Sequence, residues 1–263
     1  MHRYDIVEHI ESGSQGNVVC CTDKSSKQQV AIKVFQANST SAFAIESNVH
    51  KTMKGKSSRI CHVVDSFESY GKGYIVMEKY KADLFDMAFS SENKMNEKQL
   101  KKTFRRICRG VRDLHVRGIA HLDIKPENVL VDDHENPFLC DFGCAFVLPT
   151  EKKSEKLSRK DRCKVFAYLT GRGTKVYSAP ELSKCIPCNP FPADIFSLGV
   201  LLYTLLTGCF PTRLQNLEID ITPAKQKMDA VGYSLLSSMV SFLPFARPTI
   251  ESVLHHSWMI TIV

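Results

Sequence analysis

Apolar positions recur along the first third of the chain with the spacing of β-strands. Short apolar runs alternate with glycine and polar turns, as in the run from Val30 to Phe35. Runs of four to eight apolar or β-branched residues bounded by turn residues predict strands. We expect strands in five segments, 4–10, 11–21, 30–35, 60–67 and 74–77, which together form a small antiparallel sheet.

Three later segments have helical spacing. Residues 41–54 place Ala42, Val49 and Met53 on one stripe, which predicts a helix. Residues 96–115 begin with a capping pattern, Asn96 followed three residues later by Gln99, and continue with one apolar face. Residues 193–207 are apolar nearly all round. Because a membrane span needs about 20 such residues, we expect a buried core helix there and no membrane span.

Composition indicates a globular protein. The chain has 263 residues, 43% hydrophobic and 24% charged, which suits one large or two small domains. The net charge of +7 includes a basic run at 152–164, whose usual meaning is a solvated loop. We do not expect nucleic-acid binding, because no aromatic residue interleaves with this run before Phe166.

Cysteine usage points to a reducing compartment. The chain has ten cysteines, yet residues 1–5 lack the apolar core of a signal peptide. Free thiols are therefore expected, in the cytoplasm or alternatively the nucleus. Cys185 and Cys188 form one C-x-x-C pair without a second pair at zinc-finger spacing, so no metal is expected there.

Residues 121–143 concentrate the candidate chemistry. His121-Leu122-Asp123-Ile124-Lys125-Pro126-Glu127-Asn128 precedes an apolar run, a polar turn at 132–137 and then Cys140-Asp141-Phe142-Gly143. The turn between two apolar runs predicts a hairpin with Asn128 and Asp141 at its adjoining ends. Such a pair of oxygen ligands suits a divalent cation. Asp123 is a candidate base and Lys125 a cation nearby.

This stretch closely resembles the catalytic and magnesium loops of the eukaryotic protein kinases, H-R-D-x-K-x-x-N followed by D-F-G. Val30-Ala31-Ile32-Lys33 resembles the strand that carries the family's phosphate-binding lysine, and Ala179-Pro180-Glu181 the end of its activation segment. The resemblance covers residues 4–259 in the family's order.

The resemblance implies an α+β, bilobal protein-kinase fold in one domain, 4–259. Its N-lobe, about 4–77, would contain a five-stranded antiparallel sheet and one helix. A hinge would follow at about 78–83, and a larger, mainly α-helical C-lobe at about 84–259. ATP and Mg²⁺ are the cofactors that the family uses between these lobes.

Roles carry over position by position. The catalytic set is Asp123, Lys125, Lys33, Glu46 and Thr174, and the metal ligands are Asn128 and Asp141. The residues expected around the nucleotide are Ile10, Glu11, Ser12, Gly13, Ser14, Gln15, Gly16, Asn17, Val18, Ala31, Lys33, Met77, Glu78, Tyr80, Asp83, Glu127, Asn128, Leu130 and Asp141. Glu11 stands where the family's lid has its first glycine, which places an anion near the phosphates.

Further likenesses concern the acceptor and regulation. Lys125 followed by Pro-Glu-Asn is the Ser/Thr pattern, and His-Leu-Asp places the chain nearest the calmodulin-dependent-kinase-like group. Glu127 and Asp83 resemble acidic groups that select basic residues upstream of the acceptor, although both could simply face water. Thr170 is a candidate activating phosphosite, but Leu122 replaces the arginine that would bind its phosphate.

Two structural ties are also implied. Asp194 would hold the backbone of the catalytic loop, and Arg247 would pair with Glu181.

A substrate protein is the expected partner and a monomer the expected state. The rival interpretation is a pseudokinase that acts as a binding scaffold, and the complete set of five motif residues argues against it. A kinase of small molecules is disfavoured by the long segment ending Ala-Pro-Glu, which resembles a peptide platform.

Overall fold

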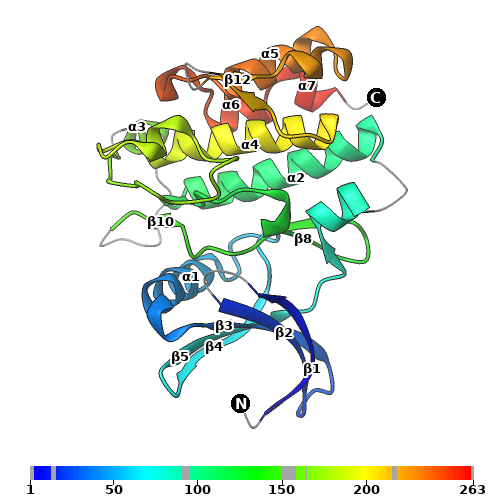
Figure 1. Ribbon diagram of the computed structural model, residues 1–263, viewed down its shortest axis with the longest axis vertical. Coiled ribbons are helices and arrows are strands. Elements are labelled where there is room, and N and C mark those ends of the chain that lie inside the picture. The colour runs from blue at the N-terminus through cyan, green and yellow to red at the C-terminus, as the bar shows by residue number, and fades with distance from the viewer. Residues whose placement is uncertain are drawn as a thin grey trace.

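A five-stranded antiparallel sheet forms the N-terminal part of the protein. The computed structural model describes residues 3–12, 16–90, 95–149, 158–163, 165–214 and 218–261, without the side chains of Glu11, Ser12, Asn38, Ser90 and Arg159. The strands are β1 (Tyr4–Ser12), β2 (Gly16–Asp23), β3 (Gln29–Phe35), β4 (Val63–Ser69) and β5 (Lys72–Glu78), in the order β1-β2-β3-β5-β4. Figure 1 shows α1 (Thr40–Met53) lying beside this sheet.

Helices dominate the remainder (Figure 1). The main ones are α2 (Glu97–His115), α4 (Pro190–Thr207) and α5 (Ala230–Met239), with shorter α3 (Arg159–Arg162), α6 (Ile250–Leu254) and α7 (Ser257–Ile260). Short strands pair as β6 (Ala82–Asp83), β8 (Val129–Val131) and β9 (Pro137–Leu139), as β7 (Ile119–Ala120) with β10 (Phe146–Val147), and as β11 (Thr212–Arg213) with β12 (Ile219–Asp220). Single helical turns are η1 (Ala37–Ser39), η2 (Asp86–Ser90), η3 (Pro126–Asn128), η4 (Pro180–Ser183), η5 (Thr222–Gln226) and η6 (Pro244–Ala246).

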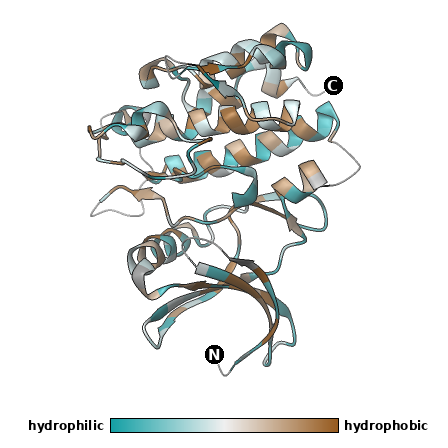
Figure 2. Ribbon diagram, viewed as in Figure 1, coloured by the Kyte–Doolittle hydropathy of each residue, from teal (hydrophilic) through white to brown (hydrophobic). Residues whose placement is uncertain are grey.

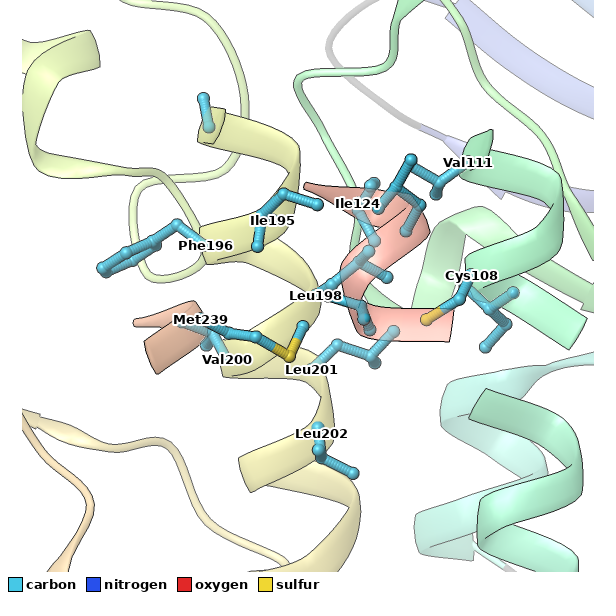
Figure 3. Packing of buried hydrophobic residues seen from close by; sticks show 14 of the residues in the cluster. Cys108, Val111, Ile124, Ile195, Phe196, Leu198, Val200, Leu201, Leu202 and Met239 are labelled. Atoms are coloured by element: carbon cyan, nitrogen blue, oxygen red, sulfur yellow. The ribbon is translucent and has the colours of Figure 1, made fainter. Parts of the chain in front are cut away.

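Helix α4 forms the centre of the larger core. Figure 2 shows it as one of the most hydrophobic elements of the chain, and Figure 3 shows its Leu198 beside Cys108 of α2. Among the described residues α4 is the one helix long and apolar enough to cross a membrane, but 78% of it is buried inside the protein. The expectation of a buried core helix is therefore confirmed, and Gly208 ends the helix in the left-handed conformation.

The predicted elements largely match the observed ones. The α+β fold with its five-stranded sheet is confirmed, and α2 starts at the expected capping box of Asn96 and Gln99. Two strand starts were wrong. Residues 11 and 12 belong to β1, so the second strand begins at Gly16 rather than at residue 11, and β4 begins at Val63 rather than at residue 60. Residues 59–61 instead bond to the other lobe: the Cys61 N–H donates to Leu139 O and the Leu139 N–H donates to Arg59 O, each at 2.9 Å. These bonds tie β9 to the segment that precedes β4.

Candidate active site

Lys33 lies between two carboxylates. Strand β3 holds it in register with Val18 of β2 and Ile75 of β5, and its Nζ lies 2.8 Å from Glu46 Oε2 on α1 and 2.8 Å from Asp141 Oδ1. Lys33 and Glu46 are both buried, whereas the Asp141 side chain is 33% exposed. The sequence placed Lys33 and Glu46 in the catalytic set and Asp141 among the metal ligands, and the structure brings the three side chains together.

Burial and charge act against each other in this trio. Burial raises the pKa of Glu46 to about 7, which Lys33 only partly offsets. Burial opposes the charge of Lys33, but Glu46 and Asp141 outweigh it and raise the lysine's pKa. Burial likewise opposes ionisation of Asp141, and Lys33 lowers its pKa below the ordinary value nonetheless. Lys33 therefore stays charged, and it holds α1 against the strand.

Asp123 is the centre of a second cluster. The Thr174 backbone N–H donates to its Oδ1 (2.6 Å), and Asn128 Nδ2 donates to its Oδ2 (3.0 Å) and its backbone oxygen (2.8 Å). Lys125 Nζ lies 3.8 Å from Oδ2. The structure thus brings together four of the predicted residues, and the tie from Thr174 to Asp123 runs through the backbone.

A buried carboxylate holds the backbone just before Asp123. Asp194 of α4 is 0% exposed and accepts hydrogen bonds from the backbone N–H groups of His121 and Leu122, each at 2.8 Å. It also lies 2.8 Å from His115 Nε2. Leu122 itself has a φ of +63° and is buried. A left-handed backbone is costly for such a residue, and the two bonds to Asp194 stabilise it.

The hairpin expected between Asn128 and Asp141 is present. Strands β8 and β9 pair antiparallel, and the Cys140 N–H donates to Asn128 O (3.1 Å). Carboxylate and amide oxygens are ligands that Mg²⁺ accepts, and the ion commonly uses only one or two carboxylates beside phosphate oxygens and water. No three His, Cys, Asp or Glu side chains in the described part of the chain gather into a metal centre of their own. The residues present therefore fit a nucleotide-bound Mg²⁺ better than a structural metal.

Apolar side chains line the expected adenine site. Val18, Ala31, Met77 and Leu130 belong to one hydrophobic cluster, as walls for a flat aromatic base require. Ile10 stays outside it and is 49% exposed.

The hinge residues are partly engaged within the protein. The Glu78 N–H donates to His62 O (3.1 Å), and the Tyr80 hydroxyl accepts from the His62 N–H (3.0 Å). Asp83 Oδ1 accepts from the Asp86 N–H (2.8 Å). Burial raises the pKa of Asp83.

The nucleotide lid is described only in part. Gly13, Ser14 and Gln15 lie outside the described residues, as do the side chains of Glu11 and Ser12. Asn17 lies on β2 opposite Val34. Gly16 has a clear structural reason, because a Cβ there would lie 2.1 Å from Val34 O. Glu127, expected near the ribose and the substrate, has a buried Oε2 atom with no hydrogen-bond partner in the described part of the chain.

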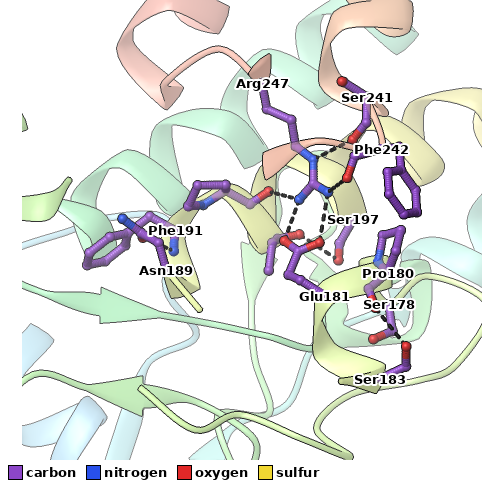
Figure 4. A network of polar contacts seen from close by, with 12 residues as sticks. Ser178, Pro180, Glu181, Ser183, Asn189, Phe191, Ser197, Ser241, Phe242 and Arg247 are labelled. Carbon is purple, nitrogen blue, oxygen red and sulfur yellow. Dashed lines mark hydrogen bonds and ion pairs between the residues drawn. The ribbon is translucent and has the colours of Figure 1, made fainter. Parts of the chain in front are cut away.

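The segment that follows Gly143 is tied at both ends. Arg172 donates to Cys144 O (2.9 Å) and Ala145 O (2.8 Å), and Thr170 is exposed with its hydroxyl donating to Lys184 O (2.9 Å). At the far end Arg247 makes two hydrogen bonds to Glu181, at 2.6 and 2.8 Å (Figure 4). That ion pair was expected from the sequence.

Sequence reasoning missed three residues that hold the site. His115 was assigned only to the end of a helix, His121 Nε2 lies 3.0 Å from Cys140 O, and Arg172 clamps the start of the long segment. A signal for His115 existed, because a buried Asp194 needs a polar partner. Arg172 stands between Gly171 and Gly173, a pattern that by itself indicates only a turn.

Comparison with known proteins gives a consistent result. The family model described as protein kinase domain matches residues 4–259. NUAK family SNF1-like kinase 1 of Mus musculus is 30% identical over 271 residues, which cover 98% of this chain and 39% of that protein. Maternal embryonic leucine zipper kinase of Danio rerio is 30% identical over 272 residues, covering 98% and 38%.

Serine/threonine-protein kinase grp of Drosophila melanogaster is 29% identical over 277 residues, covering 97% of this chain and 50% of that protein. The chain thus spans between about two fifths and one half of the length of these curated relatives.

Proposed function

Since the chain belongs to the protein kinase family, we propose that it transfers the γ-phosphoryl group of ATP to serine or threonine hydroxyls of protein substrates. The observation that carries this proposal is the position of Lys33, whose Nζ lies 2.8 Å from both Glu46 and Asp141. In kinases this lysine and this glutamate must pair, and the aspartate must be in place beside them, for phosphoryl transfer to occur.

The residues around Asp123 supply the acid–base chemistry. Asp123 accepts the proton of the substrate hydroxyl, and the bonds from Thr174 and Asn128 hold its carboxylate in one orientation. Lys125, 3.8 Å from that carboxylate, places a positive charge where the transferred group becomes more negative. Bound ATP supplies the phosphoryl group, with Mg²⁺ neutralising its charge.

Nucleotide and metal would be held by the groups already described. Lys33 would bind the α- and β-phosphates, Asp141 and Asn128 would hold Mg²⁺, and the apolar cluster of Val18, Ala31, Met77 and Leu130 would enclose adenine.

Serine or threonine as the acceptor is supported by two observations. Lys125 follows Asp123 by two residues, and the relatives named above include a serine/threonine-protein kinase. The buried, unpartnered Oε2 of Glu127 and the carboxylate of Asp83 support a preference for basic residues upstream of the acceptor. An arginine there would satisfy Glu127.

A phosphate-transfer assay on a generic basic protein tests the proposal. Asp123→Asn preserves the shape of the side chain but removes the base, and we expect a loss of about 10²- to 10⁴-fold in the transfer rate. Asp133→Asn is the matched control, since Asp133 is exposed in the turn of the same hairpin, and its rate should equal that of the wild type. An equal background signal from wild type and Asp123→Asn would favour the alternative of a pseudokinase scaffold.

A further inference from the structure

Five arginines gather away from the nucleotide site. Arg105, Arg106, Arg109 and Arg112 follow one another on α2, and Arg59 lies against that helix, since a Cβ at Gly110 would be 3.4 Å from Arg59 Cβ. Burial and the charges of the other four lower the pKa of Arg109. All five side chains are half-buried.

Most of these charges have no counter-ion in the protein. No ion pair in the described part of the chain involves Arg59, Arg105, Arg106 or Arg109. Arg59 Nε, Arg105 Nε and Arg106 Nη1 are buried without any hydrogen-bond partner among the described residues. Arg112 alone is paired, with Asp113. Like charges three and four residues apart on a helix destabilise it, so the cluster lowers the stability of the folded protein.

A cleft opens beside the cluster. It measures about 800 Å³ and lies between the 55–59 loop and the C-terminal half of α2. Its lining includes the positive side chains Lys56, Arg59, Arg112 and Arg117. Of the two acidic residues in the lining, Asp113 pairs with Arg112 and Glu251 pairs with Arg162. The free charge in the cleft is therefore positive, and none of its lining residues belongs to the nucleotide site.

We propose that this arginine cleft is a docking site for an acidic segment of a partner protein, rich in aspartate and glutamate. The guanidinium group is planar and binds a carboxylate through two parallel hydrogen bonds. A run of carboxylates would supply counter-ions for Lys56, Arg59 and Arg117, whose side chains line the cleft.

The shape of the site favours a peptide over a flat anionic surface. The positive groups line a concave cleft of a size that encloses a few residues, whereas a bilayer would contact only its rim. The positive side chains are mostly arginine, and no aromatic side chain lines the cleft to stack on nucleic-acid bases.

Fluorescence anisotropy with a labelled octaglutamate peptide tests the proposal. We expect the wild type to bind it, to ignore the octaglutamine peptide, and to bind more weakly as salt is raised. Arg59→Gln combined with Arg117→Gln, two arginines of the lining, should weaken binding by about tenfold or more. The control combines Lys72→Gln with Lys227→Gln, which removes the same charge from two exposed positions outside the cleft and should leave binding within about twofold.

A second double variant distinguishes the loss of the guanidinium groups from misfolding. Arg59→Lys with Arg117→Lys keeps the charge but not the planar group, and should bind with intermediate affinity. Equal weakening in the glutamine and control variants would overturn the proposal, because binding would then follow net charge alone. So would a wild type that ignores octaglutamate but sediments with phosphatidylserine vesicles or binds duplex DNA. Unchanged phosphate transfer in the Arg59→Gln, Arg117→Gln variant would support a site separate from the nucleotide cleft.

Discussion

Glu46, the ion-pair partner of Lys33, has a pKa well above that of an ordinary glutamate. Its carboxylate is fully buried and its pKa is raised to about 7 by that burial. As the pH falls from 8 to 6, a growing fraction of Glu46 takes up a proton and stops attracting the ammonium group of Lys33. The raised pKa means that the charged pair is present above pH 7 and is lost below it.

Substituting Glu46→Gln should therefore matter most at high pH. We expect kcat/KM for ATP to be about tenfold lower than in the wild type at pH 8, and only about twofold lower at pH 6. Steady-state kinetics across this range measure the ratio, in which titration of the nucleotide itself cancels. A ratio that stays constant with pH would show that Glu46 keeps its charge throughout.

Single residues were predictable where a motif names them. Lys33, Glu46, Asp123, Asn128 and Asp141 were identified from the spacing of the family's motifs. Contacts between residues distant in sequence were harder to predict, since nothing in the sequence of α2 indicates that His115 faces Asp194. That contact depends on how α2 and α4 pack, which hydrophobic periodicity alone does not specify.

At the scale of elements, a close contact with the sheet helps to position α1. Phe43 of α1 packs over Gly73 of β5, where an added Cβ would lie 2.4 Å from the Phe43 ring. Phe43 also packs edge-on against Phe35 of β3. Glu46 follows Phe43 by three residues on the same helix, so this contact sets the distance of Glu46 from Lys33.

Gly73→Ala should push α1 away from the sheet. Overpacking of this kind costs about 1–3 kcal/mol, to be read from urea unfolding, and kcat/KM for ATP should fall with it. Adding Phe43→Leu in the same chain makes room for the new methyl group and should restore part of both quantities. If Gly73→Ala alone leaves both unchanged, Phe43 does not position the helix.

Helices and strands could be predicted because their apolar periods are clear. The start of β4 could not, because Ile60 and Cys61 are as apolar as strand residues, yet the segment 59–61 bonds across to β9. The local pattern of apolar residues does not show whether a segment pairs with β5 or with β9. The arginines of α2 show the same limit, since a polar helical face indicates solvent unless its neighbours are known.

At the scale of the whole molecule, one buried ion pair joins parts far apart in sequence. Arg247 and Glu181 are 66 residues apart, and the Arg247 side chain is 0% exposed. Arg247 also donates to the carbonyl oxygens of Pro192, Ser241 and Phe242 (Figure 4). One guanidinium thus connects η4, α4 and the turn before η6.

Removing one partner of this pair should be severe. Arg247→Met leaves a buried carboxylate without a counter-ion, and we expect a loss of about 3–5 kcal/mol in the free energy of unfolding. Adding Glu181→Leu removes that stranded charge and should recover part of the loss, although three carbonyl oxygens stay without their donor. Lys24→Met, which breaks the exposed pair with Asp5, should cost less than about 1 kcal/mol. Similar losses in both single variants would contradict a special role for the buried pair.

Asp194 fixes the backbone of the loop that carries Asp123 when the chain folds. The backbone amides of residues 121 and 122 meet a carboxylate fixed in the core helix, so the entropy of ordering the loop is lost before any ligand arrives. Under the proposed function, nucleotide and substrate would meet groups that are already in place, and the free energy of their association would not be consumed in arranging them.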